Sequence, residues 1–331
     1  MVTDAWYPQQ NGVVRVLGTL EHHLSGDGHL VRVISPDQFK TLPCPSYPQI
    51  PLAILPGRGV AHQLQEFAPD AIHIATEGPL GWAARAWCLR HHRPFTTAYH
   101  TKFPQYVQAR TGMPLAIPYA LVRRFHAPSS GVLVPSPAIF TELEQWRFRN
   151  LRPWSHGVDT TVFRPGPKTA FDHFPRPVFL YTGRVAVEKN LPEFLELNLP
   201  GTKIVLGSGP QREQLMRRFP QAMFITASGD AELAHYYNGA DAFVFPSRTD
   251  TFGLVMLEAL ACGVPVAAFP VPGPLDVIGD SEAGALSEDL RSAALMALDI
   301  PPKSCIARAA AFSWDAVTRQ FLDNLAIDRS H

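Results

Sequence analysis

Two acids, Asp250 and Glu258, are the residues whose spacing points most clearly to chemistry. A short apolar run, 242–246, precedes them and is typical of a buried strand, and good helix formers extend from Leu254 to Ala261. In such a unit the N–H groups of Thr251–Leu254 point out of the helix N-terminus, where the dipole favours an anion. Glu258, about one turn further in, can accept hydrogen bonds from the vicinal hydroxyls of a sugar. This arrangement predicts a site for a sugar linked to phosphate.

Two cations follow an apolar run in the same half of the chain. Arg184 and Lys189 come directly after the strand expected over 178–183. Arg is suited to bidentate contact with a diphosphate, Lys acts as a point charge, and Gly183 lets the backbone approach the ligand. The alternatives are a solvated surface loop for the two cations and modest helix-end charges for the two acids. The joint appearance of all four residues in this order favours the phosphate site.

A further candidate lies in the first half of the chain. The strand-like run 95–100 delivers Tyr99 and His100 to a strand end, the usual place for ligand contacts in a parallel sheet. A single histidine at such a position is more often a structural hydrogen-bond partner than a catalyst, and the same holds for His156. His100 is therefore a candidate catalytic residue only if other motifs in the sequence support a ligand site beside it.

Patterns for metals and redox cofactors are weak. Gly207-Ser-Gly209 contains part of a dinucleotide-binding pattern, but Arg212 stands where the third glycine belongs, which disfavours an oxidoreductase. The four cysteines are far apart and form no C-x-x-C pair, which argues against a zinc site or a disulfide framework. No Asp-x-Asp motif occurs. We expect no metal and no cofactor apart from the substrate itself.

Strands alternate with helices in two series, which predicts an α/β protein with two doubly wound domains facing each other. Residues 1–4 resemble the end of a first strand, which is either clipped or begins upstream. A turn at Pro8–Gly12, a weak indication of a phosphate-binding loop, leads into a helix expected over 13–24. A strand is expected over 28–34, followed by an irregular Pro-rich passage up to Pro56.

The remaining elements fall on either side of a linker. The first series continues with strands at 71–75, 95–100 and 131–135 and helices at 80–91 and 136–146. The second has strands at 178–183, 203–207, 223–227, 242–246 and 264–269 and helices at 191–197, 211–219, 231–239, 254–261, 286–298 and 313–327. The polar, turn-rich and Pro-rich segment 155–177 is typical of an interdomain linker. We expect domains at 1–165 and 166–312, with a C-terminal helix in 313–331 that can cross back to the first domain.

Charge is distributed unevenly over the 331 residues, although the net charge is +0. Residues 1–165 contain 15 Lys and Arg against 10 Asp and Glu, so this half is basic and the other half acidic. The excess is concentrated in the segment 85–152, which we call the basic block, and aromatic residues are interleaved with it. Such a block suits anionic lipid headgroups or nucleic acid, and the alternative is a solvated surface. With no run of ~20 apolar residues and no leader-like start, the chain is expected to be cytoplasmic.

Several short motifs together resemble a known family. In the second half these are Thr182-Gly-Arg184 with Glu188-Lys189, Gly207-Ser-Gly-Pro210, Ala240-Asp241 through Pro246-Ser247, Asp250-Thr-Phe-Gly-Leu254, and Glu258-Ala-Leu-Ala with Gly263-Val-Pro-Val266. In the first half they are Pro8–Gly12, Tyr99-His-Thr101, His156-Gly-Val-Asp159 and Phe163-Arg-Pro165. The sequence thus resembles, over nearly its whole length, the retaining glycosyltransferases of family 4, which have the GT-B fold.

The resemblance implies roles for individual residues. Arg184 and Lys189 would hold the donor diphosphate, and Glu258 would bind the nucleotide ribose. The backbone from Thr251 through Phe252 and Gly253 to Leu254 would contact phosphate and sugar. Asp250 falls where the family has the first glutamate of a pair, and this shorter acid puts the identity of the hexose in doubt. Gly12 would face the diphosphate, His100 would lie near the reacting sugar, and Asn11, Tyr99 and Lys102 would form the acceptor side.

The pattern is most similar to bacterial enzymes that glycosylate lipids, including mannosyl- and sulfoquinovosyl-type transferases. It implies a metal-independent, retaining hexosyltransferase that uses a UDP- or GDP-sugar and a lipid or other glycoconjugate acceptor at the inner face of the plasma membrane, and no nucleic acid. The basic block then suits a peripheral contact with anionic membrane. A nucleotide-sugar-binding protein with a degenerate site is an alternative hypothesis. An epimerase on the same architecture is disfavoured, because no acid and base pair is visible.

Overall fold

The computed structural model describes residues 1–9, 11–44 and 47–328 and divides the chain into two compact units. Unit 1 comprises residues 1–155 and 315–331, and unit 2 comprises residues 156–314. The boundary between them precedes the one expected at 165/166, because Val158 and Phe163 belong to the hydrophobic core of unit 2. Gln10, in the expected turn Pro8–Gly12, and residues 329–331, in the expected C-terminal segment, lie outside the described residues.

Unit 1 is built on a parallel sheet. Its strands are β3 (His73–Ile74), β4 (Thr96–Ala98), β5 (Gly131–Val134) and β6 (Leu151–Pro153), adjacent in that order. Its helices are α1 (Gly12–Gly26), the 3-10 helix η1 (Pro36–Gln38), α2 (Gly57–Phe67), α3 (Pro79–Arg90), α4 (Phe103–Thr111), α5 (Ala116–His126), α6 (Pro137–Gln145) and, from Asp315 on, α14 (Trp314–Asn324). Ser136 starts α6, as its hydroxyl accepts a hydrogen bond from the N–H of Ile139.

Two single-residue bridges extend this sheet beyond β3. Val2 forms parallel bridges with Ile34 on one side and with Ile74 on the other. The strand expected over 28–34 is wrong in extent, because within this segment only Ile34 forms a bridge. In the neighbouring segment 1–4, Val2 is the residue that forms the bridges. It therefore has one bridge on each side, to Ile34 and to Ile74.

We expected the Pro-rich passage up to Pro56 to be irregular, and this expectation is wrong. The passage contains an antiparallel hairpin. β1 (Thr41–Cys44) pairs with β2 (Tyr47–Ala53), and Pro43 lies opposite Pro51. Proline has no N–H to donate and is tolerated on edge strands, and both strands of a two-stranded sheet are edges. Proline content therefore misled the prediction at this place.

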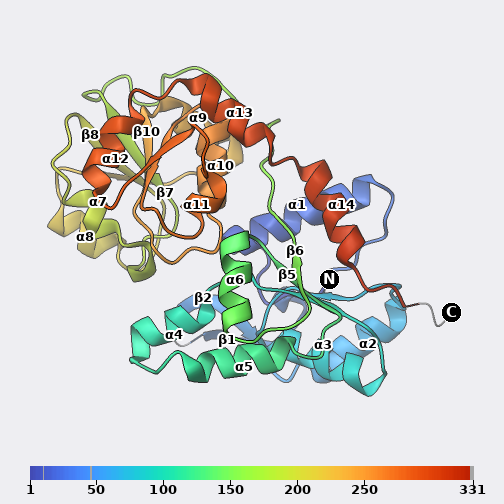
Figure 1. Cartoon of the computed structure of the whole chain (residues 1–331). Coiled ribbons are helices and arrows are strands. Elements are labelled where there is room, and N and C mark those ends of the chain that lie inside the picture. The colour runs from blue at the N-terminus through green and yellow to red at the C-terminus, as the bar shows by residue number, and fades with distance from the viewer. Residues whose placement is uncertain (10, 45–46, 329–331) are drawn as a thin grey trace. The chain divides into compact units, whose positions relative to one another are not determined.

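The last helix returns the chain to unit 1 (Figure 1). The indole N–H of Trp154 donates to the carbonyl of Val317 (3.2 Å), and the guanidinium of Arg152 donates to the carbonyl of Asn324 (3.0 Å). The ring of Phe321 lies 5.2 Å from that of Trp154 and 5.0 Å from that of His73. These contacts attach α14 to the sheet of unit 1, and the expected C-terminal helix that crosses back is confirmed.

Unit 2 contains a six-stranded parallel sheet in the order β12-β11-β10-β7-β8-β9. Its strands are β7 (Val178–Thr182), β8 (Thr202–Leu206), β9 (Met223–Ile225), β10 (Ala242–Phe245), β11 (Val266–Ala268) and β12 (Gly284–Leu286). Its helices are the 3-10 helix η2 (Val187–Lys189), α7 (Leu191–Leu195), α8 (Arg212–Arg218), α9 (Asp230–Gly239), α10 (Leu254–Ala261), α11 (Pro274–Val277), α12 (Leu290–Ala297) and α13 (Pro302–Ala310). The chain winds from β7 outward to β9 and then returns to the other side of β7, which confirms a doubly wound fold.

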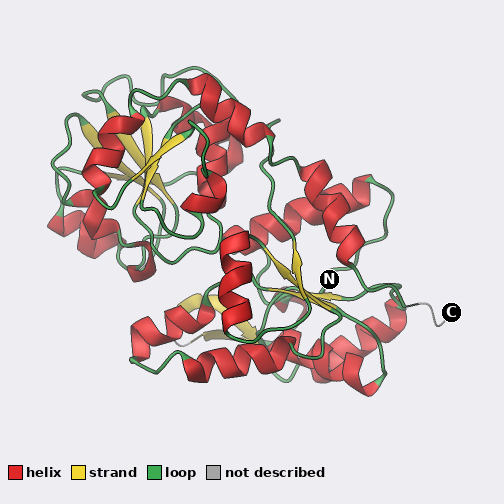
Figure 2. Cartoon of the chain, in the orientation of Figure 1, coloured by secondary structure: helices red, strands yellow, loops and turns green. Residues whose placement is uncertain are grey.

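Helices cover both faces of this sheet (Figures 1 and 2). Side chains alternate along the strands, so Leu180 and Phe243 enter the core under α9 and α10, while Phe179 and Ala242 enter the core under α7 and α12. Strands buried on both faces read as continuous apolar runs, which is why the sequence revealed them.

Three cysteines, Cys88, Cys262 and Cys305, are buried, and burial raises the pKa of each thiol to about 12. They are therefore poor nucleophiles near neutral pH. Among the residues that the structure describes, no helix combines the length and the apolar character needed to span a bilayer.

Candidate active site

The candidate site lies where the winding of unit 2 changes direction. β7 and β10 are neighbouring parallel strands, with Phe243 paired to Leu180, yet β8 and β9 come between them in the chain. The loops that leave their carboxyl ends therefore diverge from adjacent points, and such a switch point is the usual ligand site of an open α/β sheet. The loop after β7 carries Arg184 and Lys189, and the loop after β10 carries Asp250.

Lys189 and Asp250 form an ion pair that joins these two loops. The Lys189 side chain is 19% exposed and that of Asp250 is 15% exposed, so the pair is mostly withdrawn from water. Burial alone would lower the pKa of Lys189, but the attraction of Asp250 outweighs it and the pKa is raised. Lys189 therefore stays charged. The two residues that the sequence assigned to diphosphate and sugar are direct neighbours.

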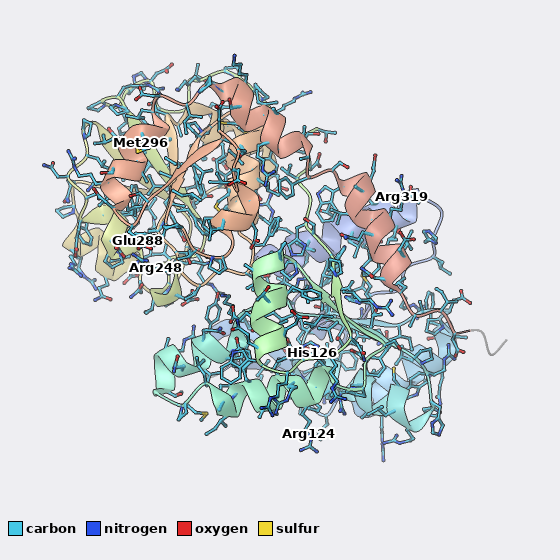
Figure 3. All side chains as sticks on the ribbon, in the orientation of Figure 1. Arg124, His126, Arg248, Glu288, Met296 and Arg319 are labelled. Atoms are coloured by element: carbon cyan, nitrogen blue, oxygen red, sulfur yellow. The ribbon has the colours of Figure 1, made fainter. Side chains whose placement is uncertain are left out.

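Two side-chain hydroxyls and one backbone carbonyl also join these two loops. Ser247 and Thr249 both donate from their side-chain hydroxyls to the carbonyl of Glu188, at 3.3 and 3.2 Å. Arg248 packs its guanidinium carbon 3.5 Å from the ring centroid of Phe269 and lies 3.1 Å from a carboxylate oxygen of Glu288. Figure 3 labels Arg248 and Glu288 in unit 2. These contacts hold the segment before Asp250 on the sheet, although the sequence analysis did not single out Arg248.

The glycines of Gly207-Ser-Gly209 pack the loop after β8 against the loop after β7. A Cβ atom on Gly207 would lie 1.9 Å from the carbonyl oxygen of Gly183, and one on Gly209 would lie 2.3 Å from that of Val185. Both glycines have positive φ angles, +151° and +156°. The N–H of Val185 donates to the carbonyl of Ser208 at 2.8 Å. The structure thus explains this motif by close backbone packing that supports Gly183 and Arg184.

Arg184 is half-buried at the start of the loop after β7, and its carbonyl accepts a 2.9 Å hydrogen bond from the Tyr181 hydroxyl. The same hydroxyl would lie 2.9 Å from a Cβ atom on Gly183, whose φ is +139°. Gly183 therefore allows the backbone to pass closely over Tyr181. This fixes the course of the backbone from which Arg184 projects.

Glu258 lies on α10 and is 4% exposed. Its Oε2 accepts a 2.9 Å hydrogen bond from the hydroxyl of Tyr237 on α9, and that hydroxyl lies 2.5 Å from Oγ1 of Thr182 at the end of β7. A buried carboxylate requires such donors. Tyr237 is a residue of this site that sequence reasoning missed, because nothing in the helical pattern of 231–239 distinguishes it.

The loop between Asp250 and α10 is partly buried. Phe252 is in the core, with its ring 5.2 Å from that of His156, so that its backbone rather than its side chain is suited to a ligand. Gly253, in the left-handed region with φ +92°, is the N-cap of α10, and Thr251 and Leu254 are half-buried on either side of it. The first turn of a helix has N–H groups without intrahelical acceptors, as an anion-binding loop requires.

The candidate residues of unit 1 have different surroundings. His100 follows β4 at its carboxyl end, with its ring 5.7 Å from that of Trp154. Tyr99 is 1% exposed and its ring packs 6.3 Å from that of Phe148, a core position that does not fit the expected contact with an acceptor. Lys102 is also buried and lies 2.8 Å from Oε2 of Glu142, which satisfies its charge inside the unit.

Asn11 and Gly12 lie at the start of α1. The side chain of Asn11 accepts a 3.0 Å hydrogen bond from the N–H of Val14 and so caps the helix. This structural role accounts for the Asn-Gly turn without a ligand. Gly12 is exposed as the first residue of α1. The ligand contacts of Asn11, Gly12 and His100 stay predictions.

Two family models match the chain. That of Glycosyltransferase Family 4 matches residues 10–162, and that of Glycosyl transferases group 1 matches residues 176–298. Each covers most of one half of the sequence, so together they account for both units.

Curated relatives agree with these matches. The sulfoquinovosyl transferase SQD2 of Arabidopsis thaliana is 30% identical over 295 residues, which is 84% of this chain and 57% of that protein. A GDP-mannose-dependent alpha-mannosyltransferase of Mycobacterium tuberculosis is 28% identical over 313 residues, covering 86% of this chain and 82% of that protein. An alpha-monoglucosyldiacylglycerol synthase of Streptococcus pneumoniae is 28% identical over 91% of this chain and 78% of that protein. The chain thus spans little more than half of the plant relative.

Solved structures share the fold. The sucrose-phosphate synthase of Thermosynechococcus elongatus superposes with a TM-score of 0.73 at 20% identity, over 95% of this chain and 92% of that one. Anabaena HepE, solved in complex with UDP and glucose, gives a TM-score of 0.70 at 15% identity over 97% of both chains. With two doubly wound units and family models over both halves, the chain belongs to family 4 of the glycosyltransferases and has the GT-B fold.

Proposed function

We propose that this chain transfers a hexose from a UDP- or GDP-sugar to an acceptor hydroxyl, with retention of configuration and without a metal ion. The observation that carries the proposal is the ion pair of Lys189 and Asp250 at the switch point of unit 2. It brings a cation suited to phosphate and an acid suited to sugar hydroxyls to one place, next to the N-terminus of α10.

In this reaction the bond between the anomeric carbon and the diphosphate oxygen breaks, and the acceptor oxygen bonds to the same carbon on the same face. The acceptor's proton passes to the departing diphosphate, which serves as the base. Negative charge develops on the diphosphate as its bond to the anomeric carbon breaks, ahead of this proton transfer. Lys189 and Arg184 stabilise that charge, and by comparison with oxyanion donors each contributes about 3 kcal/mol to the transition state. Positive charge from these side chains and from the α10 N-terminus takes the part that a divalent ion plays elsewhere.

The two acids divide the rest of the donor between them. Asp250 contacts the hexose hydroxyls and returns Lys189 to its resting ion pair when the donor leaves. Glu258, held by Tyr237, accepts hydrogen bonds from the ribose hydroxyls. Since Asp250 is one methylene shorter than Glu, the hexose must approach the backbone of Thr251–Leu254 closely.

The acceptor is a lipid or another glycoconjugate. One relative is named as a synthase of alpha-monoglucosyldiacylglycerol, a glycolipid, which supports a lipid acceptor for this chain as well. Unit 1 has a suitable surface on α5, where Ile117 (57% exposed) and Leu121 (52% exposed) lie one turn apart, with exposed Arg124 one turn further. We infer a peripheral contact with anionic membrane through this part of the basic block.

Not all of the basic block takes part in such a contact. Arg85 donates to the carbonyls of Phe125 and Arg124, both at 2.9 Å. Arg152 donates to the carbonyls of Ser130 (3.1 Å) and Asn324 (3.0 Å). These arginines hold segments of unit 1 together, so the charge available to a membrane is smaller than the sequence indicates.

Transfer is tested with radiolabelled nucleotide sugars and a lipid extract. Arg184→Ala and Lys189→Ala are each expected to lower kcat/KM by about 100-fold. Arg217→Ala and Lys303→Ala, which remove exposed cations of the same unit, serve as matched controls and are expected to leave it unchanged. Unaltered turnover in folded Arg184→Ala and Lys189→Ala proteins would refute the site. A binding protein without transfer activity would show a ligand-dependent Tm and no product.

The membrane contact is tested by cosedimentation with vesicles of phosphatidylcholine, with and without phosphatidylglycerol. Binding is expected to require the anionic lipid and to weaken as salt is added. The double variant Ile117→Ser/Leu121→Ser is expected to bind less. Equal binding to neutral and anionic vesicles would count against the proposal.

A further inference from the structure

Four arginines of the basic block converge on one pocket of unit 1. The pocket has a volume of about 470 Å³ and lies between the second half of α5 and the loop that precedes β6. Its lining residues are Ala120, Arg123, Arg124, His126, Ala127, Arg147, Phe148 and Arg149. Figure 3 labels Arg124 and His126, both of which belong to α5. Both lining segments lead into strands, so the pocket is at the amino edge of the sheet, whereas His100 is at the carboxyl edge.

The four arginines of this pocket have no carboxylate beside them in the lining, whereas the lining His126 lies 3.1 Å from Oε1 of Glu77. No Asp or Glu is among the lining residues. Within the described part of the chain, none of Arg123, Arg124, Arg147 and Arg149 forms an ion pair with a carboxylate. The nearby Arg85 reflects the same excess of positive charge, since its pKa is lowered first by burial and then by repulsion from Arg124. Charges of one sign that are held together without a counter-charge favour an anionic ligand.

The dipole of α5 explains only part of this arrangement. Cations near a helix C-terminus are favourable, which accounts for Arg123 and Arg124 in the last turn. Arg147 and Arg149 come from a different segment, after α6. Buried Phe148 between them fixes the loop, and its N–H donates to the carbonyl of Leu143 at 3.0 Å. The two arginines therefore flank an anchored residue and stay exposed.

Arg147 occupies a position that its residue type does not favour. It follows the C-cap of α6 with a φ of +62°, in the left-handed region where helices usually end on glycine. Its N–H donates to the carbonyl of Glu144 at 2.8 Å, which fixes this conformation. The side chain of Arg147 therefore projects from a position where glycine would be more stable.

The chemistry of the pocket points to phosphate. Guanidinium groups bind phosphate oxygens in a bidentate manner, and several of them around one space suit a tetrahedral group with several oxygens better than a planar carboxylate. Arg123 is already oriented, because it donates a 3.0 Å hydrogen bond to the carbonyl of Trp146. A long nucleic acid would need an extended basic stripe with exposed aromatic rings, whereas Phe148 is buried.

We propose that the pocket formed by Arg123, Arg124, Arg147 and Arg149 binds a phosphate group, carried by a lipid headgroup or by a small soluble ester. This site is separate from the donor site of unit 2 and does not depend on transfer activity. The exposed Ile117 and Leu121 lie on the same helix as Arg124, so a lipid phosphate bound in the pocket would have apolar side chains close to its acyl chains.

The binding test uses the full chain and isothermal titration with inorganic phosphate and glycerol 3-phosphate. The wild-type protein is expected to bind at least one of them, and Arg147→Gln/Arg149→Gln to bind it at least about 10-fold more weakly. Arg58→Gln/Arg90→Gln removes the same charge from exposed positions of unit 1 outside the pocket and is the matched control. Cosedimentation with phosphatidylglycerol vesicles separates the two sources, since a headgroup site loses vesicle binding in the pocket variant and a site for soluble esters does not.

A second variant distinguishes a role of Arg147 in phosphate binding from a role in the stability of the fold. Arg147→Gly is expected to raise Tm, because glycine adopts a positive φ without strain, and at the same time to weaken phosphate binding. A residue with only a structural role would not separate the two readouts.

Three results would overturn the proposal: no binding of either phosphate probe by the wild-type protein, equal binding by the pocket variant, or an equal loss in the control variant. None of these measurements requires a nucleotide sugar. If the phosphate site fails these tests, the proposed transfer activity is unaffected. If the transfer assays fail, the phosphate site is likewise unaffected.

Discussion

The Tyr237 hydroxyl donates a 2.9 Å hydrogen bond to Oε2 of the buried Glu258 carboxylate. Tyr237→Phe removes this donor without changing the shape of the core, and we expect it to lower the free energy of unfolding by about 1–3 kcal/mol. Because Glu258 is assigned to the ribose, KM for the donor should rise more than kcat falls. Tyr236→Phe is the control, since that hydroxyl bonds to Glu232 in a partly exposed position. Urea unfolding and donor kinetics measure both effects, and an unchanged KM would contradict the role of Tyr237.

Asp250→Asn tests the separate roles of the two paired residues, Lys189 on the diphosphate and Asp250 on the hexose. Loss of the carboxylate releases Lys189, so a nucleoside diphosphate should bind at least as tightly as to the wild-type protein. The contacts of Asp250 with the hexose are lost at the same time, and kcat/KM for transfer should fall about 10- to 100-fold. Titration with the diphosphate and transfer assays separate the two effects. Asp280→Asn, at an exposed position of unit 2, should change neither. Weaker diphosphate binding together with intact transfer would reverse the assignment.

Asp241, directly before β10, should make unit 2 sensitive to acid. Its carboxylate accepts hydrogen bonds from the N–H of Val178 (2.6 Å), from Lys168 (2.6 Å) and from Arg176 (2.8 Å). Burial alone would raise the pKa of Asp241, but these partners outweigh it and lower the pKa. A lowered pKa contributes stability that is present above the unfolded value and is lost as the pH falls through the folded value.

Asp241→Asn should therefore cost about 1–3 kcal/mol of unfolding free energy near neutral pH, and this difference should shrink below about pH 4. Denaturant unfolding at several pH values measures it. Asp299→Asn, an exposed change in the same unit, should follow the wild-type protein throughout. A difference that stays constant with pH would show that the charge of Asp241 is not the cause.

Gly207→Ala should disrupt the packing of the loops after β7 and β8. The added Cβ would lie 1.9 Å from the carbonyl oxygen of Gly183, the residue directly before Arg184. We expect a loss of at least about 3 kcal/mol together with weaker donor binding. Gly229→Ala meets no atom within 4 Å and should cost less than about 1 kcal/mol. Melting curves of the two variants decide the point, and equal Tm values would refute the close approach.

The sequence was most informative in unit 2. Apolar runs buried on both faces marked its strands, and charged residues after two of them marked the ends of β7 and β10. Since parallel strands end at one edge, Lys189 and Asp250 could be placed near each other, and the structure makes them an ion pair. What local pattern could not show is which strands are neighbours, because the order of the sheet depends on the whole chain.

Side chains whose role depends on burial were beyond the reach of the sequence. Tyr99 and Lys102 follow β4 as ligand contacts would, yet one lies in the core and the other is paired with Glu142. Tyr237 supports Glu258 from another helix, 21 positions away in the chain, and no spacing rule connects them. The hairpin of β1 and β2 was missed because its prolines look like breaks unless the strands are known to be edges.

The attachment of α14 to unit 1 has a consequence for folding during protein synthesis. Unit 2 is continuous in the chain, whereas unit 1 needs both its first 155 residues and the segment after Trp314. During synthesis, Trp154 can contact Val317 and Phe321 only after all of unit 2 has been synthesised. Unit 1 can therefore complete its fold only after the continuous unit 2 is available to fold.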